Sequence, residues 1–143
     1  MKRFLLITSL VAGLTLGCKR SDSDPNPADP TTLLAGTWYL TSTTQTSTPT
    51  LGSPTTGNFR YPKGSVKRVY TSSTVETFLH NVSQDVSTYT LVGSFYTTVA
   101  SNGATSTHTL KLLTKDQFST EYTVFSGAGT NPTTTVILYN HER

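Results

Sequence analysis

The sequence predicts an all-β domain, an up-and-down antiparallel β-barrel of about seven to nine strands. Hydrophobic residues make up 34% of the 143 residues and charged residues only 13%, so Thr and Ser supply most of the polar surface. Thr favours strands over helices. Apolar residues recur with period two, beginning with Trp38 and Leu40, and short turn sequences separate these runs. A barrel removes the exposed edges of so Thr-rich a sheet, and a β-sandwich is the alternative.

Residues 1–17 have the form of a secretory signal, with two basic residues followed by an apolar run from 4 to 16 and then Gly17. Thirteen helical residues span about 20 Å, less than the hydrocarbon core of about 30 Å, so a membrane-spanning helix is the weaker alternative. Removal of the two basic residues lowers the formal charge from +3 to +1. So small a charge excludes an electrostatic footprint for nucleic acid.

Cys18 is the single cysteine of the chain, so an intrachain disulfide is impossible and we expect a chemical role. The sequence Thr15-Leu16-Gly17-Cys18 resembles the lipobox of bacterial lipoproteins, with Thr15 where Leu is usual. The resemblance implies that Cys18 carries a diacylglyceryl thioether and an acylated amino terminus, with palmitate as a typical chain. More than one acyl chain makes membrane attachment stable. Ordinary cleavage nearby is the alternative.

Residues 18–31 are rich in Pro and Asp and form the predicted disordered linker. Lys19 follows the cysteine, where enteric lipoproteins retained at the inner membrane carry Asp. By that analogy we expect a lipid-anchored protein of the cell envelope, at the outer membrane.

The predicted barrel domain occupies residues 32–143, and alternation of apolar and polar residues defines its strands. A helical turn at 31–34 precedes the first strand, and Pro and Gly make 46–57 a long loop. Gly93 is expected to bend one long strand over 89–99. Asn102-Gly103 predicts a two-residue type I′ hairpin turn. The predicted strands are 36–41, 58–61, 66–70, 75–82, 89–99, 105–113, 118–124 and 133–140.

Three pieces of the domain together resemble the small lipocalin-like lipoprotein domains of Bacteroidetes: Leu34-x-Gly36-x-Trp38, the run 113–118, and Leu138-Tyr139 followed by Arg143. The resemblance implies that Gly36 allows a close backbone approach and that Trp38 plugs one end of the barrel. It also implies that Trp38 packs against Arg143. These residues form the expected structural plug.

The sequence contains no recognisable catalytic set, and we expect no enzyme activity, catalytic residue, metal site or cofactor. His80, His108 and His141 fall on separate predicted strands without metal-ligand spacing. The carboxylates fall mainly near turns or on polar faces. Four basic residues around one hairpin form either a solvated surface or an anion-binding, phospholipid-facing edge: Arg60, Lys63, Lys67 and Arg68.

Two functional hypotheses follow. The first is a monomeric, lipid-anchored module that binds a small hydrophobic ligand inside its barrel. The second is a tethered structural or protein-interaction domain whose barrel is filled by side chains. The candidate ligand-lining residues are Leu40, Phe78, Tyr89, Leu91, Phe95, Leu110, Leu112, Tyr122 and Leu138. The long loop at 46–57 is a candidate lid over one mouth of the barrel.

Overall fold

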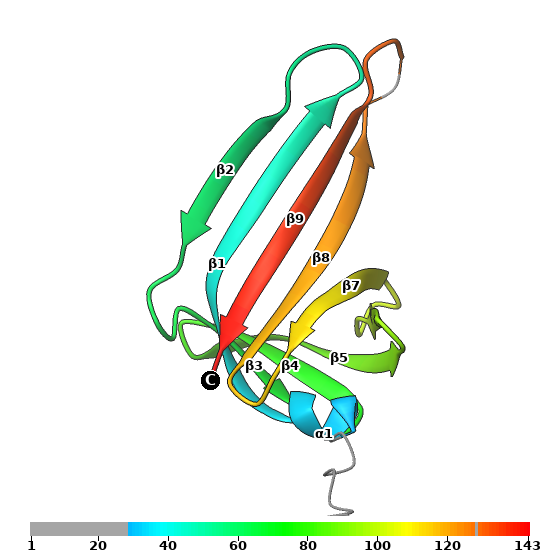
Figure 1. Cartoon of the computed structure of the whole chain (residues 1–143). Coiled ribbons are helices and arrows are strands. Elements are labelled where there is room, and N and C mark those ends of the chain that lie inside the picture. Colours follow the sequence, from blue (N-terminus) through cyan, green and yellow to red (C-terminus); the bar gives the residue numbers. More distant parts are fainter. Residues whose placement is uncertain (1–28, 128) are drawn as a thin grey trace, which may run out of the picture.

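The computed structural model describes residues 29–127 and 129–143. The predicted signal at 1–17, Cys18 and most of the predicted linker lie outside the described residues. One short helix, α1 (Pro30–Leu34), precedes nine antiparallel strands. Figure 1 shows how the labelled elements are arranged. The strands are β1 (Gly36–Pro49), β2 (Thr55–Arg60), β3 (Val66–Tyr70), β4 (Thr74–Leu79), β5 (Val82–Val92), β6 (Phe95–Val99), β7 (Thr105–Leu113), β8 (Gln117–Ser126) and β9 (Thr133–Glu142).

Eight of the strands close into an antiparallel barrel, and β2 is an additional strand. Residues 36–39 of β1 pair with β3, while residues 39–49 pair with β9, with a register shift between Leu40 and Ser42. From β3 to β9 each strand pairs with the next one in the chain. The all-β class and the closed antiparallel barrel predicted from the sequence are therefore confirmed.

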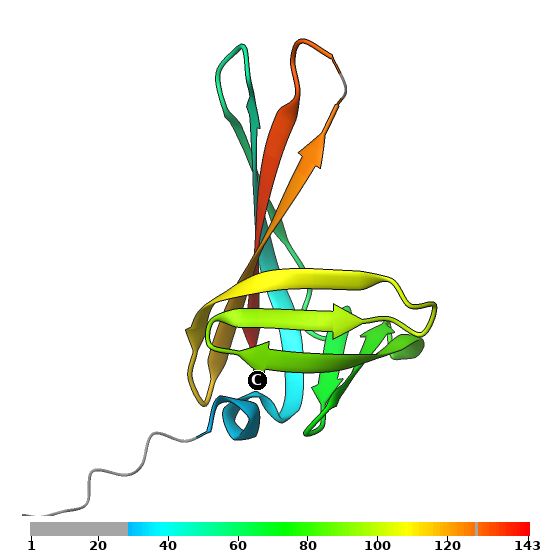
Figure 2. The ribbon, with the colours of Figure 1, turned by 90° about the vertical axis from the view of Figure 1, so that its right-hand side faces the viewer.

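The second half of β1 leaves the barrel and forms a protruding sheet, defined as β2 together with residues 43–49, 122–126 and 133–138 (Figures 1 and 2). This corrects the prediction of a loop from 46 to 57, because β1 continues to Pro49 and β2 begins at Thr55. Hydroxyl side chains contact one another across the strands here, as between Thr46 and Thr56 (3.2 Å).

The long strand predicted over 89–99 is a hairpin in the structure. The chain turns at Gly93, whose φ is 58°, and Val92 pairs with Phe95 across the turn. A glycine with positive φ in the first turn position fits a two-residue hairpin. The residues after this turn therefore take the opposite face from the one that an unbroken strand would give them.

The turn between β6 and β7 also differs from the expected type. Asn102 does not have a positive φ, whereas Gly103 has a φ of 83°. The Gly103 N–H donates to the carbonyl of Ala100 (2.9 Å), and the Asn102 side chain accepts from the N–H of Ala104 (2.9 Å). This is a three-residue loop rather than the predicted two-residue type I′ turn. Consecutive residues with positive φ occur instead at His80 and Asn81.

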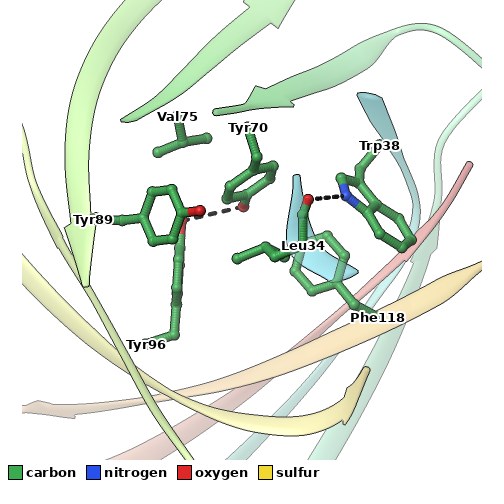
Figure 3. Packing of buried hydrophobic residues seen from close by; sticks show 7 residues of the cluster. All are labelled: Leu34, Trp38, Tyr70, Val75, Tyr89, Tyr96 and Phe118. Carbon is green, nitrogen blue, oxygen red and sulfur yellow. Dashed lines mark hydrogen bonds between the residues drawn. The ribbon is translucent and has the colours of Figure 1, made fainter. Parts of the chain in front are cut away.

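The apolar core lies at one end of the barrel, which α1 covers (Figures 1 and 3). The Trp38 indole N–H donates to the carbonyl of Leu34 (2.7 Å), and the Trp38 ring packs edge-on against Phe118 at 4.9 Å between centroids. A second aromatic layer follows, in which the Tyr96 hydroxyl donates to that of Tyr70 (3.2 Å). We call this packed region, from α1 to the Tyr70 layer, the closed end.

Candidate functional site: a polar cavity in the barrel lumen

A cavity of about 330 Å³ occupies the barrel beyond the closed end. Side chains two residues apart on a strand share one face. Tyr70 points into the barrel, so Arg68, two residues earlier on β3, also points inward and lines the cavity. Nine of the eleven lining residues carry a polar side-chain atom, so the lumen is predominantly polar here. The lining residues are Arg68, Val75, Thr77, Ser87, Tyr96, Thr98, Ala100, Ser106, His108, Tyr122 and Tyr139.

The β6–β7 turn lies at the end of the barrel away from α1, as Figure 2 shows. Thr98, Ala100 and Ser106 flank this turn and line the cavity. We call this part of the barrel the open end. The floor of the cavity is the ring of Tyr96, which belongs to both the cavity lining and the core.

Arg68 brings a positive charge into the lumen. Burial opposes its charged form, but the neighbouring Tyr70 and Tyr96 phenols outweigh that effect and hold the pKa of Arg68 above its ordinary value. The ion pairs found among the described residues are Lys111 with Glu121 and Lys115 with Asp116, so Arg68 has no carboxylate partner within that part of the chain. Its Nε is buried and has no hydrogen-bond partner among the same residues.

His108 lies in the same cavity among aromatic rings. It stacks on Tyr122 with 4.8 Å between ring centroids and lies 5.9 Å from both Tyr96 and Tyr139. Burial, and secondarily the charge of Arg68, lower the pKa of His108 to about 4. The imidazole is therefore neutral at pH 7, and its buried Nδ1 has no partner among the described residues.

One acidic residue, Asp85, lies near the cavity on β5. Its carboxylate accepts hydrogen bonds from Ser87 and from Ser101 (3.0 Å), and the bond from Ser87 is the leading cause of its lowered pKa. Hydroxyl donors thus stabilise the ionised carboxylate of Asp85, which does not form an ion pair with Arg68.

Five of the predicted ligand-lining residues point into the barrel, but only Tyr122 lines the cavity. Leu40 and Tyr89 are buried, and the Tyr89 hydroxyl donates to the carbonyl of Thr71 (2.7 Å). Leu91 and Leu110 pack against the core. These four residues fill the interior rather than face the cavity.

Phe95 and Leu112 do not line the cavity, and a local irregularity explains each case. Phe95 is 58% exposed because the chain turns at Gly93. Leu112 is 43% exposed because a bulge between Leu110 and Leu112 reverses the alternation of β7.

The two remaining candidates point away from the lumen: Phe78 lies on the outer face of the barrel, and Leu138 is the last residue of β9 in the protruding sheet. Phe78 pairs with Lys67, whose Nζ lies 4.1 Å from the centre of the phenyl ring. Lys67 neighbours Arg68 on β3 and so points away from the lumen. Leu138 alternates with Tyr139, which lines the cavity.

The structure brings the expected plug residues together at the closed end. The Arg143 guanidinium carbon lies 4.5 Å from the centre of the Trp38 ring, and its Nη2 donates to the carbonyls of Leu33 (2.7 Å) and Ala35 (2.8 Å). Gly36 has a φ of 125°, and a Cβ at that position would lie 3.6 Å from Arg143. The plug thus joins α1, β1 and the end of β9.

The histidines and basic residues singled out by sequence take different positions. His141 is buried at the closed end, stacked on Phe118 at 4.1 Å, and burial lowers its pKa to about 2. His80 occupies the exposed turn between β4 and β5. Among the described residues, no group of three His, Cys, Asp or Glu side chains is arranged to hold a metal ion. The four basic residues are divided, because Arg68 points inward while Lys67 lies outside.

Within residues 29–127 and 129–143, no helix has both the length and the apolar character needed to cross a membrane. Comparison of the chain with models of protein families, with curated proteins and with solved structures finds no match.

Sequence reasoning missed the main feature of the site, the charge of Arg68 inside the barrel. The signal was present in the alternation of β3, where Arg68 shares a face with Tyr70. We grouped Arg68 with the nearby basic residues because of their proximity in the sequence. Consecutive residues of a strand point to opposite faces, however, so Lys67 and Arg68 lie on different sides of β3.

Proposed function

We propose that the chain is a lipid-anchored, non-enzymatic domain of the cell envelope that binds one small amphipathic molecule in the open end of its barrel. The cavity of about 330 Å³ carries this proposal. Its volume falls at the low end of the range of about 300–1,000 Å³ for ligand pockets. An eight-stranded barrel has room either for its own side chains or for one small ligand, and the cavity supports the second case.

The polar lining changes the ligand predicted from the sequence. A wholly apolar molecule would leave the buried polar atoms of Arg68 and His108 without partners, which is energetically costly. A molecule with a polar head would supply such partners, while its apolar part contacts Val75 and the rings of Tyr122 and Tyr139. The proposed ligand is therefore amphipathic.

Binding is tested by native mass spectrometry of protein extracted gently from its own membrane, followed by thermal-shift measurements with fatty acids, quinones and sterol-like molecules. We expect a retained small molecule and an increase in melting temperature with at least one class. The absence of both would favour the alternative of a tethered interaction domain. The protruding sheet, where Phe125 is 80% exposed, would then be the surface to examine.

In this proposal the lipid anchor is at Cys18. The residue that follows it is Lys19 rather than Asp, which supports a location at the outer membrane. Labelling cells with a radioactive fatty acid tests the anchor. Wild-type protein should take up label and remain in the membrane fraction, whereas Cys18→Ser should do neither. Equal labelling of the two proteins would contradict the lipid anchor.

A further inference from the structure

We propose that the cavity recognises a carboxylate-bearing amphipathic molecule whose carboxylate binds the guanidinium of Arg68. This inference rests on the proposed function and specifies its ligand class. Three features of the described residues carry it: the position of the charge, the absence of a carboxylate partner for it, and the donor-rich surroundings.

The position of Arg68 makes its charge available to a bound molecule. The side chain lines the cavity, next to the Tyr70–Tyr96 layer that forms the boundary with the packed core. A ligand that enters from the open end reaches Arg68 with its leading group. The guanidinium has five N–H donors in a planar fork, which matches the two oxygens of a carboxylate.

The charge has no carboxylate partner among the described residues. Asp85, on the open side of the cavity, instead accepts from Ser87 and Ser101. An unpaired charge in a protein interior is costly, and pairing with a hydrogen-bonded anion removes much of that cost. A bound carboxylate would therefore stabilise the folded domain as well as satisfy Arg68.

The surroundings favour an anion over a cation. The lining contains hydroxyls of Thr77 and Thr98 and phenols of Tyr122 and Tyr139, all of which can donate hydrogen bonds. Neutral His108 can also donate one. A cationic head group would meet the positive charge of Arg68 without a compensating carboxylate in contact with it, so the lining discriminates against amines.

Octanoate, octanol and octylamine test this inference, because they share an eight-carbon chain and differ in head-group charge. Isothermal titration calorimetry uses the full chain purified in a mild detergent, with the variants Arg68→Met and Lys67→Met. Lys67→Met is the matched control, since it removes the same charge from the adjacent residue of β3 on the outer face. Partition into micelles affects all three proteins equally. Circular dichroism and the melting temperature establish that each variant is folded.

Wild type and Lys67→Met should bind octanoate at least tenfold more tightly than octanol and should not bind octylamine. Arg68→Met should lose this preference while it still binds octanol. Equal affinity of wild type for octanoate and octanol would overturn the carboxylate inference but leave ligand binding intact. Equal losses in Arg68→Met and Lys67→Met would also overturn it. If wild type binds none of the probes, while native mass spectrometry finds no retained molecule, the proposed function itself fails.

Discussion

The closed and open ends of the barrel are built from the same strands but packed by different rules. At the closed end, Trp38 and Phe118 are buried and their rings pack edge-on against each other. At the open end, the inward positions of the same sheet carry Arg68 and His108 around a cavity. The change occurs within two residues of β3, between Tyr70 and Arg68. The packed core and the proposed binding site thus occupy separate segments of one lumen, and mutations should affect stability and ligand affinity separately.

Replacement of Trp38 by Ala should have the largest effect on stability. The substitution removes a buried ring that contacts Phe118 and α1, and such truncations cost about 3–5 kcal/mol. Native domains are stable by only about 5–15 kcal/mol, so a loss of about 5 kcal/mol would remove nearly all the stability of a domain at the lower end of that range. Urea denaturation measures the change in the free energy of unfolding. Phe125→Ala, at an exposed aromatic of the protruding sheet, is the control and should change stability by less than about 0.5 kcal/mol.

The two interior histidines should make the domain less stable in acid. Both have a folded-state pKa below the ordinary value of 6.5, about 2 for His141 and about 4 for His108. The unfolded chain therefore binds protons first as the pH falls below 6.5. The contribution of each neutral histidine is fully present above pH 6.5 and is lost as the pH falls toward its folded-state pKa, by up to about 1.4 kcal/mol per pH unit.

Urea denaturation between pH 7.5 and 5 measures this dependence with limited interference from carboxylates. His141→Phe, which keeps a ring against Phe118, should remove the contribution of the closed-end histidine to the pH dependence of the free energy of unfolding. His108→Phe should remove the contribution of the open-end histidine. Octanoate should reduce the His108 contribution alone, because only that histidine lines the cavity. A free energy of unfolding that does not change over this range would contradict the buried, neutral state of both residues.

Replacement of Arg143 by Ala should have a smaller effect, about 1–2 kcal/mol. The guanidinium contacts the Trp38 ring and two carbonyls at the end of α1, but Arg143 is exposed and its interactions are weakened by water. Arg143→Lys should recover part of the loss, because Lys keeps the charge but not the planar donor group. Melting temperatures should rank wild type above Arg143→Lys and Arg143→Lys above Arg143→Ala. Octanoate affinity should be the same in all three proteins.

The closed end was largely accessible from the sequence, whereas the cavity was not. Alternation in the first strand placed Trp38 and Leu40 on one inward face, and the structure buries both. The hairpin at Gly93 reverses the parity of the residues that follow it and so places Tyr96 and Thr98 in the cavity lining. The bulge between Leu110 and Leu112 turns Leu112 away from the barrel interior. A shift of one residue in the register of a strand moves its inward side chains to the outer face. The local sequence does not specify where such a shift occurs. Side-chain parity is therefore predictable only between such irregularities.

The contact between Arg143 and α1 also bears on the topology of the chain. It places the last residue 2.7 Å from a carbonyl of the helix that precedes the first strand, so the two ends of the domain are adjacent. Because β1 pairs with both β3 and β9, the barrel strands form a closed ring. The two ends of the domain lie next to each other in that ring, between β9 and α1. A short peptide from Arg143 to Pro30, with new termini in the exposed turn at Lys63-Gly64, would give a circular permutant that keeps every strand pair.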